Sequence, residues 1–256
     1  MPCRLDIRPG SPNDPLVTVV TPVYNALSTL ERTVDSVRAQ DFGDWELILS
    51  DDGSTDGSDD LAQRLACKDP RIRFLPHACN TGAAQARNRA LGVARGQFVA
   101  FLDADDEWLP HKLRRQIQFM RETGAAFTYS GYLRVRGSRR REVRVPPSVD
   151  YAGLLGGNVI GCLTAVYDTA QLGRVEMPDL RLRQDYALWL KLLRQVDCAR
   201  AVPEPLALHH LRTGSLSSAR WAALRATWTL YRQVEGLPRH RAATCLTRHL
   251  TRRLFN

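Results

Sequence analysis

The sequence predicts an α/β fold with a doubly wound sheet, and three observations lead to this class. Apolar or β-branched runs alternate with stretches of helical periodicity over the first hundred residues, which is typical of parallel strands joined by right-handed crossovers. The chain has 256 residues, 44% of them hydrophobic, enough for one large domain with or without an appendage. Polar loops follow the predicted strands, where open α/β sheets bind ligands.

The first strand, helix and second strand are predicted before residue 51. Leu16–Thr21 is rich in β-branched residues and ends at Pro22, as expected for a buried strand. Residues 28–39 carry apolar side chains at helical spacing, and β character resumes over 45–50. This order of strand, helix and strand begins the alternation.

The alternation continues to a strand that ends in carboxylates. Ser58 is expected to cap a helix over 59–66, and residues 72–75 form a short predicted strand. A helix over 83–94 and a strand over 97–102 follow.

The next segments follow a looser pattern. We expect a helix over 110–121 and a strand with aromatic residues over 125–134. Residues 137–144 form an arginine-rich turn, in which Arg139–Arg141 is predicted to be an exposed, mobile hairpin tip.

The last part of the chain is basic. From Ser218 onward there are eight arginines against Glu235 alone, so this segment contributes +7 of the total formal charge of +9. Aromatic and leucine residues recur there at helical spacing, which predicts an amphipathic helix with an aromatic stripe. They are Trp221, Leu224, Trp228 and Tyr231. The helix could pack on the domain, lie on a membrane surface or, less favoured, meet nucleic acid.

Neither a signal peptide nor a membrane span is expected. Residues 1–15 contain arginine, acid and proline without an apolar stretch, and no run of about 18 apolar residues occurs. The six cysteines show neither paired nor metal-ligand spacing, so they are interpreted as reduced thiols of a cytoplasmic chain.

Three aspartates follow the strand over 97–102. Asp103, Asp105 and Asp106 would place hard anionic oxygens at the carboxyl end of the sheet, and a cation would relieve their mutual repulsion. Oxygen ligands at this density suit Mg²⁺ or Mn²⁺, which in turn suit a diphosphate. The alternative is a solvated acidic turn.

Four polar loops are expected to converge on one crevice, because each follows a predicted strand. They are Thr21–Asn25, Ser50–Ser54, Asn80–Asn88 and Asp103–Asp106. An aromatic ring and an asparagine can hold a flat base, paired acids can accept hydrogen bonds from base or ribose, and an arginine can face phosphate. Each loop alone has an ordinary structural explanation, whereas together they predict a nucleotide-diphosphate site.

On these motifs the chain resembles glycosyltransferase family 2, the inverting enzymes of the GT-A fold. The resemblance covers about 17–218 and includes five motifs in the family's order. They are Thr21–Asn25, Asp51–Asp56, Asn80–Asn88, Asp103–Asp106 and Gln184–Tyr186. It implies a doubly wound mixed sheet with a C-terminal helical extension, and transfer of a sugar from a nucleotide-sugar donor, expected to be UDP-linked, with Mn²⁺ or Mg²⁺ as cofactor.

The resemblance also implies residue roles on the donor side. Asp51 would read the base, Pro22 and Tyr24 would line its pocket, and Arg87 would contact the nucleotide. The full set of expected nucleotide-binding residues is Thr21, Pro22, Tyr24, Asn25, Asp51, Asp52, Gly82, Arg87, Asp103 and Ala104. Asp103 and Asp105 would bind the cation.

Two further segments complete the implied site. The segment around His210 and Arg212 would fold over the diphosphate, with His210 contacting phosphate or the metal and Arg212 contacting phosphate. Asp185 would be the catalytic base, although the family's usual acid pair is here Gln184–Asp185. From the residues alone, Asp185 is more simply interpreted as a helix N-terminal carboxylate that interacts favourably with the helix dipole. A single in-line displacement needs a base for the attacking hydroxyl, which is the role it would supply.

The implied organisation is a transferase domain over 1–218 and a basic amphipathic tail over 219–256. Within the domain, 16–110 would bind the nucleotide and 111–218 the acceptor. In this reading Arg139–Arg141 could alternatively contact an anionic acceptor.

The resemblance implies an acceptor hydroxyl on a glycan or polyprenyl-linked glycan in cell-envelope polysaccharide synthesis. The enzyme would work in the cytoplasm or peripherally on the inner membrane, without nucleic acid. Two other functions compete. A phosphohydrolase of the haloacid dehalogenase type shares the Asp-x-Asp after a strand, but Glu107 stands where that family has Thr or Val. A non-catalytic basic binding protein would explain the arginine tail.

Overall fold

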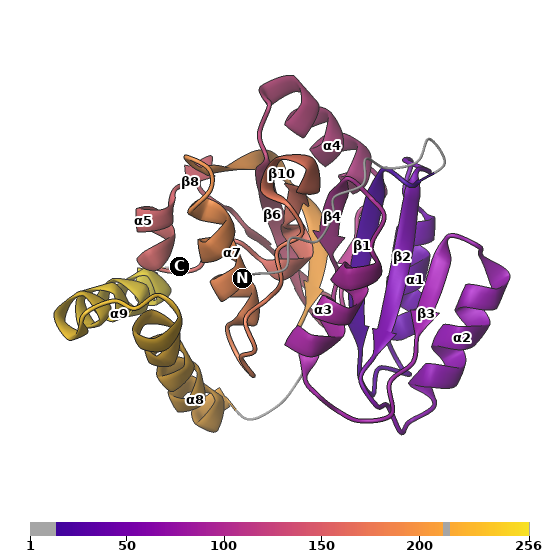
Figure 1. The fold of residues 1–256 in the computed structure, drawn as a ribbon, viewed down its shortest axis with the longest axis horizontal. Coiled ribbons are helices and arrows are strands. Elements are labelled where there is room, and N and C mark those ends of the chain that lie inside the picture. Colours follow the sequence, from indigo (N-terminus) through magenta and orange to yellow (C-terminus); the bar gives the residue numbers. More distant parts are fainter. Residues whose placement is uncertain (1–13, 212–215, 256) are drawn as a thin grey trace, which may run out of the picture.

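A mixed sheet runs through the molecule and carries helices on its faces (Figure 1). The structure is a computed structural model that describes residues 14–211 and 216–255, without the side chains of 216–220 and 252–255. Within these residues the sheet has ten strands, and its main path is β3-β2-β1-β4-β9-β6-β10-β5. β7 pairs with β6, and β8 pairs with β10.

The amino-terminal half is the predicted parallel part of the sheet. β1 lies between β2 and β4 and is parallel to both, and β3 continues the parallel order beyond β2. The strands are β1 (Val17–Val23), β2 (Trp45–Asp51), β3 (Ile72–Leu75) and β4 (Phe98–Phe101). The helices between them are α1 (Leu30–Arg38), α2 (Ser58–Lys68) and α3 (Ala83–Val93). The predicted alternation of strand and helix is confirmed.

The second half makes the sheet mixed. β9 runs antiparallel to both β4 and β6, whereas β10 runs parallel to β6. The strands are β5 (Glu107–Trp108), β6 (Phe127–Arg136), β7 (Arg139–Val143), β8 (Ser148–Val149), β9 (Val166–Asp168) and β10 (Ala199–His210). The helices are α4 (Lys112–Thr123), α5 (Tyr151–Leu155), the 3-10 turn η1 (Cys162–Thr164), α6 (Thr169–Leu172) and α7 (Gln184–Leu193).

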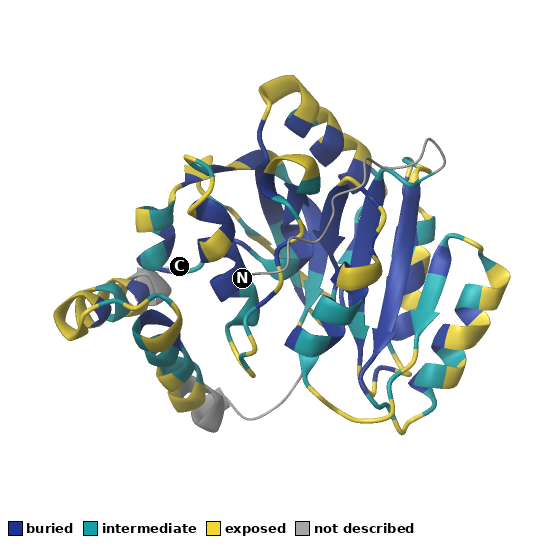
Figure 2. Ribbon diagram, viewed as in Figure 1, coloured by how far each residue is buried: buried dark blue, intermediate teal, exposed yellow. Residues whose placement is uncertain are grey.

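Two apolar clusters cover the two faces of the sheet. Successive side chains of a strand point to opposite faces, so neighbouring strand residues belong to different clusters. On β4, for example, Phe101 belongs to the first cluster and Ala100 to the second. On the first face, Trp189 of α7 packs its ring 5.4 Å from the rings of both Phe101 and Phe127. Figure 2 shows the central strands buried and the outer helix faces exposed. The clusters fix α7 against the sheet.

The start of α2 differs from the prediction that Ser58 caps it. Ser58 is the first helical residue, and its backbone N–H donates to Asp56 Oδ1 over 3.0 Å. The Ser58 hydroxyl accepts instead from the backbone N–H of Ala26 over 2.8 Å. The cap prediction was therefore wrong, because the carboxylate two residues earlier takes the free N–H.

The arginine-rich segment is a strand rather than a turn. β6 and β7 form a hairpin in which Arg136 lies opposite Arg139, so its turn is Gly137 and Ser138. Gly137 has φ 60°, the positive value that the first position of a type II′ turn requires. Arg139–Arg141 therefore lies on β7, exposed, and the prediction of a tip there was wrong.

The C-terminal extension contains two helices with a π-helical segment between them. These are α8 (Leu216–Thr229), η2 (Leu230–Val234) and α9 (Arg239–Phe255). They lie at the end of the molecule opposite β3 (Figure 1). The boundary drawn between residues 218 and 219 falls inside α8.

The predicted aromatic stripe is divided between core and surface. Leu230 and Tyr231 are fully buried and join the cluster that contains Tyr186, whereas Trp221 is 72% exposed. One continuous stripe was therefore a wrong expectation, because burial increases along the extension from the exposed Trp221 through Leu224 and Trp228 to the buried Tyr231. In the part of the chain that the structure describes, no helix is long and apolar enough to cross a membrane.

Candidate functional site

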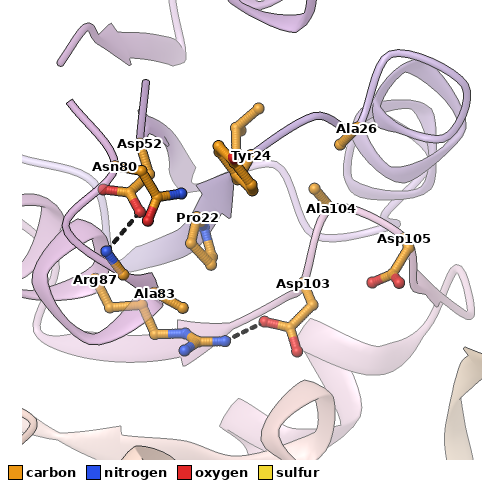
Figure 3. Close-up of a pocket in the computed structure, with 12 residues that line it drawn as sticks. Pro22, Tyr24, Ala26, Asp52, Asn80, Ala83, Arg87, Asp103, Ala104 and Asp105 are labelled. Carbon is orange, nitrogen blue, oxygen red and sulfur yellow. Dashed lines mark hydrogen bonds and ion pairs between the residues drawn. The ribbon is translucent and has the colours of Figure 1, made fainter. Parts of the chain in front are cut away.

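A cavity of about 300 Å³ opens where β1, β2 and β4 end (Figure 3). Its lining residues come from all four predicted loops, apart from Ala26, which directly follows the first loop. They are Pro22, Val23, Tyr24, Ala26, Asp52, Asn80, Gly82, Ala83, Arg87, Asp103, Ala104 and Asp105. In Figure 3, Pro22 and Tyr24 lie between Asp52 on one side and Asp103 and Asp105 on the other. The predicted convergence of the loops is confirmed.

Some predicted donor residues brace the cavity instead of lining it. Asn25, at φ 47°, accepts at its side-chain oxygen from the Thr55 backbone N–H over 2.9 Å. Thr21 is fully buried on β1, and its hydroxyl has no hydrogen-bond partner among the described residues. The Asp51 carboxylate accepts from the N–H groups of Gly53 and Ser54 over 2.9 and 3.0 Å.

Asp52 joins the second and third loops. Its carboxylate accepts from the backbone N–H groups of Thr81 and Gly82 over 3.0 and 2.7 Å, and Arg89 lies 3.3 Å away. Burial alone would raise the pKa of Asp52, but these hydrogen bonds outweigh it and lower the pKa. Gly53 lets the loops meet, since a Cβ there would lie 2.8 Å from the Cys79 carbonyl carbon.

Thr81 and Arg89 are contributors that the sequence reasoning missed. The Thr81 hydroxyl donates to Asp52 over 2.8 Å, and Arg89 Nη2 donates to the Asp51 carbonyl over 2.7 Å. Thr81 lies inside the motif Asn80–Asn88 and Arg89 directly after it, but their shared partner Asp52 lies 29 and 37 residues earlier in the chain.

Arg87 is the main cation of the cavity. It is 4% exposed on α3, and its Nη2 forms an ion pair with Asp103. Burial acts to lower the pKa of Arg87, but the Asp103 carboxylate overcomes this and raises it, so the guanidinium stays charged. Its Nε and Nη1 have no hydrogen-bond partner among the described residues. Two nitrogen atoms of a charged guanidinium are therefore buried beside the cavity without the acceptor that they require.

The aspartate cluster carries an excess of negative charge. Burial and the neighbouring Asp103 raise the pKa of Asp106 to about 8, although its carboxylate accepts from the His210 backbone N–H over 2.9 Å. Asp103 and Asp105 both line the cavity. Among the described residues no three acidic, histidine or cysteine side chains form a metal cluster. The oxygen donors of Asp103 and Asp105, in this negative field, fit a divalent cation.

His210 is engaged by a neighbouring acid. Its Nε2 lies 2.6 Å from Glu107 Oε1, and Arg32 Nε lies 3.0 Å from the same oxygen. The backbone of Asp105 accepts from Arg32 over 3.0 Å, so this group ties α1 to the acidic loop. The structure therefore places His210 on Glu107 rather than in a cluster with Asp103 and Asp105. Arg212 lies outside the described residues.

Asp185 begins helix α7 beside the Arg87–Asp103 pair. Burial raises the pKa of Asp185, opposed by the Tyr186 backbone N–H and by the charge of Arg87. Arg183, the residue directly before α7, has φ 70°, an uncommon conformation for a residue with a Cβ. A half-buried carboxylate with a raised pKa suits a general base.

The surroundings of Asp185 come from distant parts of the chain. Arg183 Nε donates to the Thr227 hydroxyl of α8 over 3.1 Å, and the Tyr186 and Tyr231 hydroxyls lie 3.0 Å apart. Gln184 Oε1 is buried without a hydrogen-bond partner among the described residues. The sequence reasoning missed Thr227 and Tyr231, because no local motif joins them to Asp185.

The model of the family described as Glycosyl transferase family 2 matches residues 18–169. TuaG of Bacillus subtilis, a glycosyltransferase assigned to teichuronic acid biosynthesis, is 42% identical over 92% of this chain and 94% of its own length. The Escherichia coli protein WfgD, named as a UDP-Glc:α-D-GlcNAc-diphosphoundecaprenol β-1,3-glucosyltransferase, is 34% identical over 84% of this chain and 85% of its own.

Solved structures share the fold at low sequence identity. S. aureus TarS 1-349 in complex with UDP-GlcNAc aligns over 91% of this chain and 71% of that chain, with a TM-score of 0.71 and 20% identity. The mannosyltransferase PcManGT of Pyrobaculum calidifontis, in complex with GDP-Man and Mn²⁺, aligns over 95% and 71%, with a TM-score of 0.70 and 19% identity. The expected GT-A fold is confirmed.

Proposed function

This chain belongs to glycosyl transferase family 2 and is a glycosyltransferase, and from that premise we propose metal-dependent, inverting sugar transfer from a nucleotide-sugar donor. The acceptor is a hydroxyl of a glycan or lipid-linked glycan in cell-envelope polysaccharide synthesis. The observation that carries the proposal is the buried Arg87, which pairs with Asp103 in the strand-end cavity and whose Nε and Nη1 have no hydrogen-bond partner among the described residues. Such donors suit a diphosphate.

The donor is proposed to bind with its base near Pro22 and Tyr24 and its diphosphate toward Arg87. Tyr24 is 50% exposed at the mouth of the cavity, where an aromatic face can stack on a base. UDP is favoured because TarS structures contain UDP and UDP-GlcNAc, and because WfgD is named as UDP-Glc dependent.

Asp103 and Asp105 are the residues that would hold Mn²⁺ or Mg²⁺. When bound, the cation offsets the negative charge that develops on the departing diphosphate. His210 is a further candidate only if it leaves Glu107.

Asp185 is proposed to accept the proton of the attacking acceptor hydroxyl. Its raised pKa brings a carboxylate closer to the operating pH, which favours a general base. The hydroxyl oxygen attacks the anomeric carbon as the bond to the diphosphate breaks, so a single displacement inverts that centre. Arg87 keeps its positive charge throughout and faces the donor.

The acceptor proposal rests on the named relatives. TuaG is assigned to teichuronic acid biosynthesis, and WfgD acts by its name on a diphosphoundecaprenol-linked sugar. Membership of this enzyme family favours the transferase over the phosphohydrolase and the non-catalytic binding protein. We place its work at the cytoplasmic face of the inner membrane.

The donor proposal is tested with Asp105→Ala. Calorimetric titration of UDP in Mn²⁺ should show that the variant loses the metal-dependent part of binding, because one carboxylate ligand is gone. Asp60→Ala, an exposed aspartate on α2, is the matched control and should bind as the parent does. Unchanged Mn²⁺-dependent UDP affinity in Asp105→Ala would remove Asp105 from the cation site.

Membrane contact is proposed for the exposed side of the C-terminal extension. Trp221 and Arg225 are exposed on α8, and Arg239, Arg241 and Arg248 are exposed on α9. Each arginine near an anionic surface contributes about 1 kcal/mol, which salt weakens. Removing the whole extension would also remove the buried Tyr231, so point substitutions are the sharper test.

We expect full-length protein to sediment with phosphatidylglycerol vesicles at low salt and Trp221→Ala/Arg225→Gln to do so less. Arg64→Gln, an exposed arginine on α2 at the opposite end of the molecule, is the control. If neither the parent nor the control binds vesicles, the extension serves only to pack on the domain.

A further inference from the structure

The β6–β7 hairpin presents four arginines on one face. Arg134 lies opposite Arg141, and Arg136 lies opposite Arg139. Directly paired residues of an antiparallel ladder share a face, and so do residues two apart on one strand. We define these four residues as the arginine ladder. The other face carries Arg140 beside an acid, Glu142.

Both cross-strand pairs of the ladder place like charges together. Such pairs destabilise a hairpin, so folding alone gives no reason to keep them. Among the described residues no ion pair to an acid includes Arg134, Arg136 or Arg139. Arg134 Nε is buried without a hydrogen-bond partner, and its Nη2 has only the Tyr132 hydroxyl at 3.4 Å. Three of the four ladder arginines, Arg134, Arg136 and Arg139, therefore concentrate positive charge without an acid partner among the described residues.

The ladder is continuous with the acceptor side of the site. Arg134 is in register with His209 of β10, and the His209 ring meets Tyr132 edge-on at 5.9 Å between centroids. Tyr132 also approaches Gly161, directly before Cys162. The next residue of β10, His210, donates its backbone N–H to Asp106 over 2.9 Å, so this end of the strand reaches the aspartate loop beside the cavity.

We propose that the arginine ladder binds the diphosphate group of a lipid-linked acceptor, while the acceptor sugar reaches toward Asp185. This inference rests on the proposed function. Guanidinium groups bind phosphate oxygens bidentately, and two cross-strand pairs, successive pairs being about 7 Å apart along the strands, can engage two linked phosphates. The donor diphosphate has its own cation, Arg87, in the cavity. The ladder is therefore a second anion site on the opposite side of the reacting hydroxyl.

The test uses farnesyl diphosphate as the probe and full-length protein saturated with UDP and Mg²⁺, so that the donor site is filled. Calorimetry should show binding to the parent protein and about tenfold or greater weakening in Arg136→Gln/Arg139→Gln, because charge-assisted hydrogen bonds are lost. Arg140→Gln removes one positive charge from the other face of the same hairpin and should bind within about twofold of the parent.

Three outcomes would overturn the inference. The first is that farnesyl diphosphate does not bind to the parent protein, and the second is that Arg140→Gln weakens binding as much as the double variant does. The third is that the double variant loses binding to phosphatidylglycerol vesicles but keeps farnesyl diphosphate binding, which would make the ladder a membrane contact. Thermal unfolding should show the double variant at least as stable as the parent, since like-charge pairs are removed. UDP affinity is measured separately. A protein that does not bind UDP would contradict the proposed function, whereas the ladder is judged by farnesyl diphosphate binding alone.

Discussion

The two halves of the molecule treat buried charge in opposite ways. In the amino-terminal half, Glu46 is 1% exposed and binds Arg73 and Arg95 over 3.0 and 2.9 Å. In the second half, Lys112 is fully buried with only the amide oxygen of Gln116 at 2.9 Å and the Trp108 ring at 4.2 Å. Among described residues no acid pairs with Lys112.

The pKa shifts follow this difference. Burial would raise the pKa of Glu46, but the Thr18 hydroxyl, the Arg95 backbone N–H and two arginines lower it. Burial without compensation lowers the pKa of Lys112 to about 7. Burial also raises the pKa of Asp185, although the Tyr186 backbone N–H and the charge of Arg87 oppose it. Paired charge therefore keeps Glu46 ionised in the amino-terminal half, whereas Lys112 and Asp185 of the second half, like Asp106 beside the cavity, have pKa values away from the ordinary ones.

The largest expected effect comes from Asp185→Asn. Removing the carboxylate should lower turnover by roughly two to four powers of ten and leave UDP affinity unchanged, because the donor cavity lies on the other half. Steady-state rates of nucleotide release with acceptor present, together with UDP titration, measure both. Asp179→Asn, nearby in sequence before α7, is the control. Near-parental turnover would assign the base elsewhere, with Asp106 and Glu107 tested next.

The two halves also differ in how much of their structure the sequence predicts. β3 was predicted at its observed bounds, and α3 within one residue, because apolar periodicity is local. The donor loops were predicted for the same reason, since Asp51 and Gly53 contact within three residues. Their convergence needed only the rule for parallel strands.

The acceptor half depends on contacts that no local pattern contains. β9 enters between β4 and β6 in antiparallel orientation, and no local pattern of residues indicated this placement. Arg183 meets Thr227 from 44 residues away, and Tyr186 meets Tyr231 from 45. The roles of Asp185 and Arg87 in one site came from the family resemblance rather than from periodicity.

The second largest effect concerns the buried Lys112 and is measured as a change in the free energy of unfolding with pH. The folded pKa of Lys112 is about 7 against an ordinary 10.5, so the unfolded chain binds more protons between these values. The contribution of Lys112 to the free energy of unfolding should therefore rise by about 1.4 kcal/mol per pH unit from about pH 7 toward 10.5. Acidification reverses this gain.

Lys112→Met should remove that rise while keeping the side-chain volume over Trp108. Denaturant unfolding at pH 7 and pH 9 measures the difference between parent and variant. Lys68→Met, at an exposed position on α2, should leave the pH dependence as it is in the parent. Equal pH slopes in the parent and Lys112→Met would mean that Lys112 has an ordinary pKa and that its burial is compensated.

The smallest effect tests whether the C-terminal extension positions the acceptor half. The Thr227 hydroxyl accepts from Arg183 Nε, and Arg183 holds its positive φ directly before the turn of Asp185. Thr227→Val should cost about 1 kcal/mol of stability, lower kcat severalfold and leave UDP affinity unchanged. Thr227→Ser keeps the hydroxyl and should restore kcat. Thr247→Val removes an exposed hydroxyl that donates to the Ala243 carbonyl and should change neither quantity. A loss of stability at unchanged kcat would make the contact purely structural, and the acceptor half would then position Asp185 without help from α8.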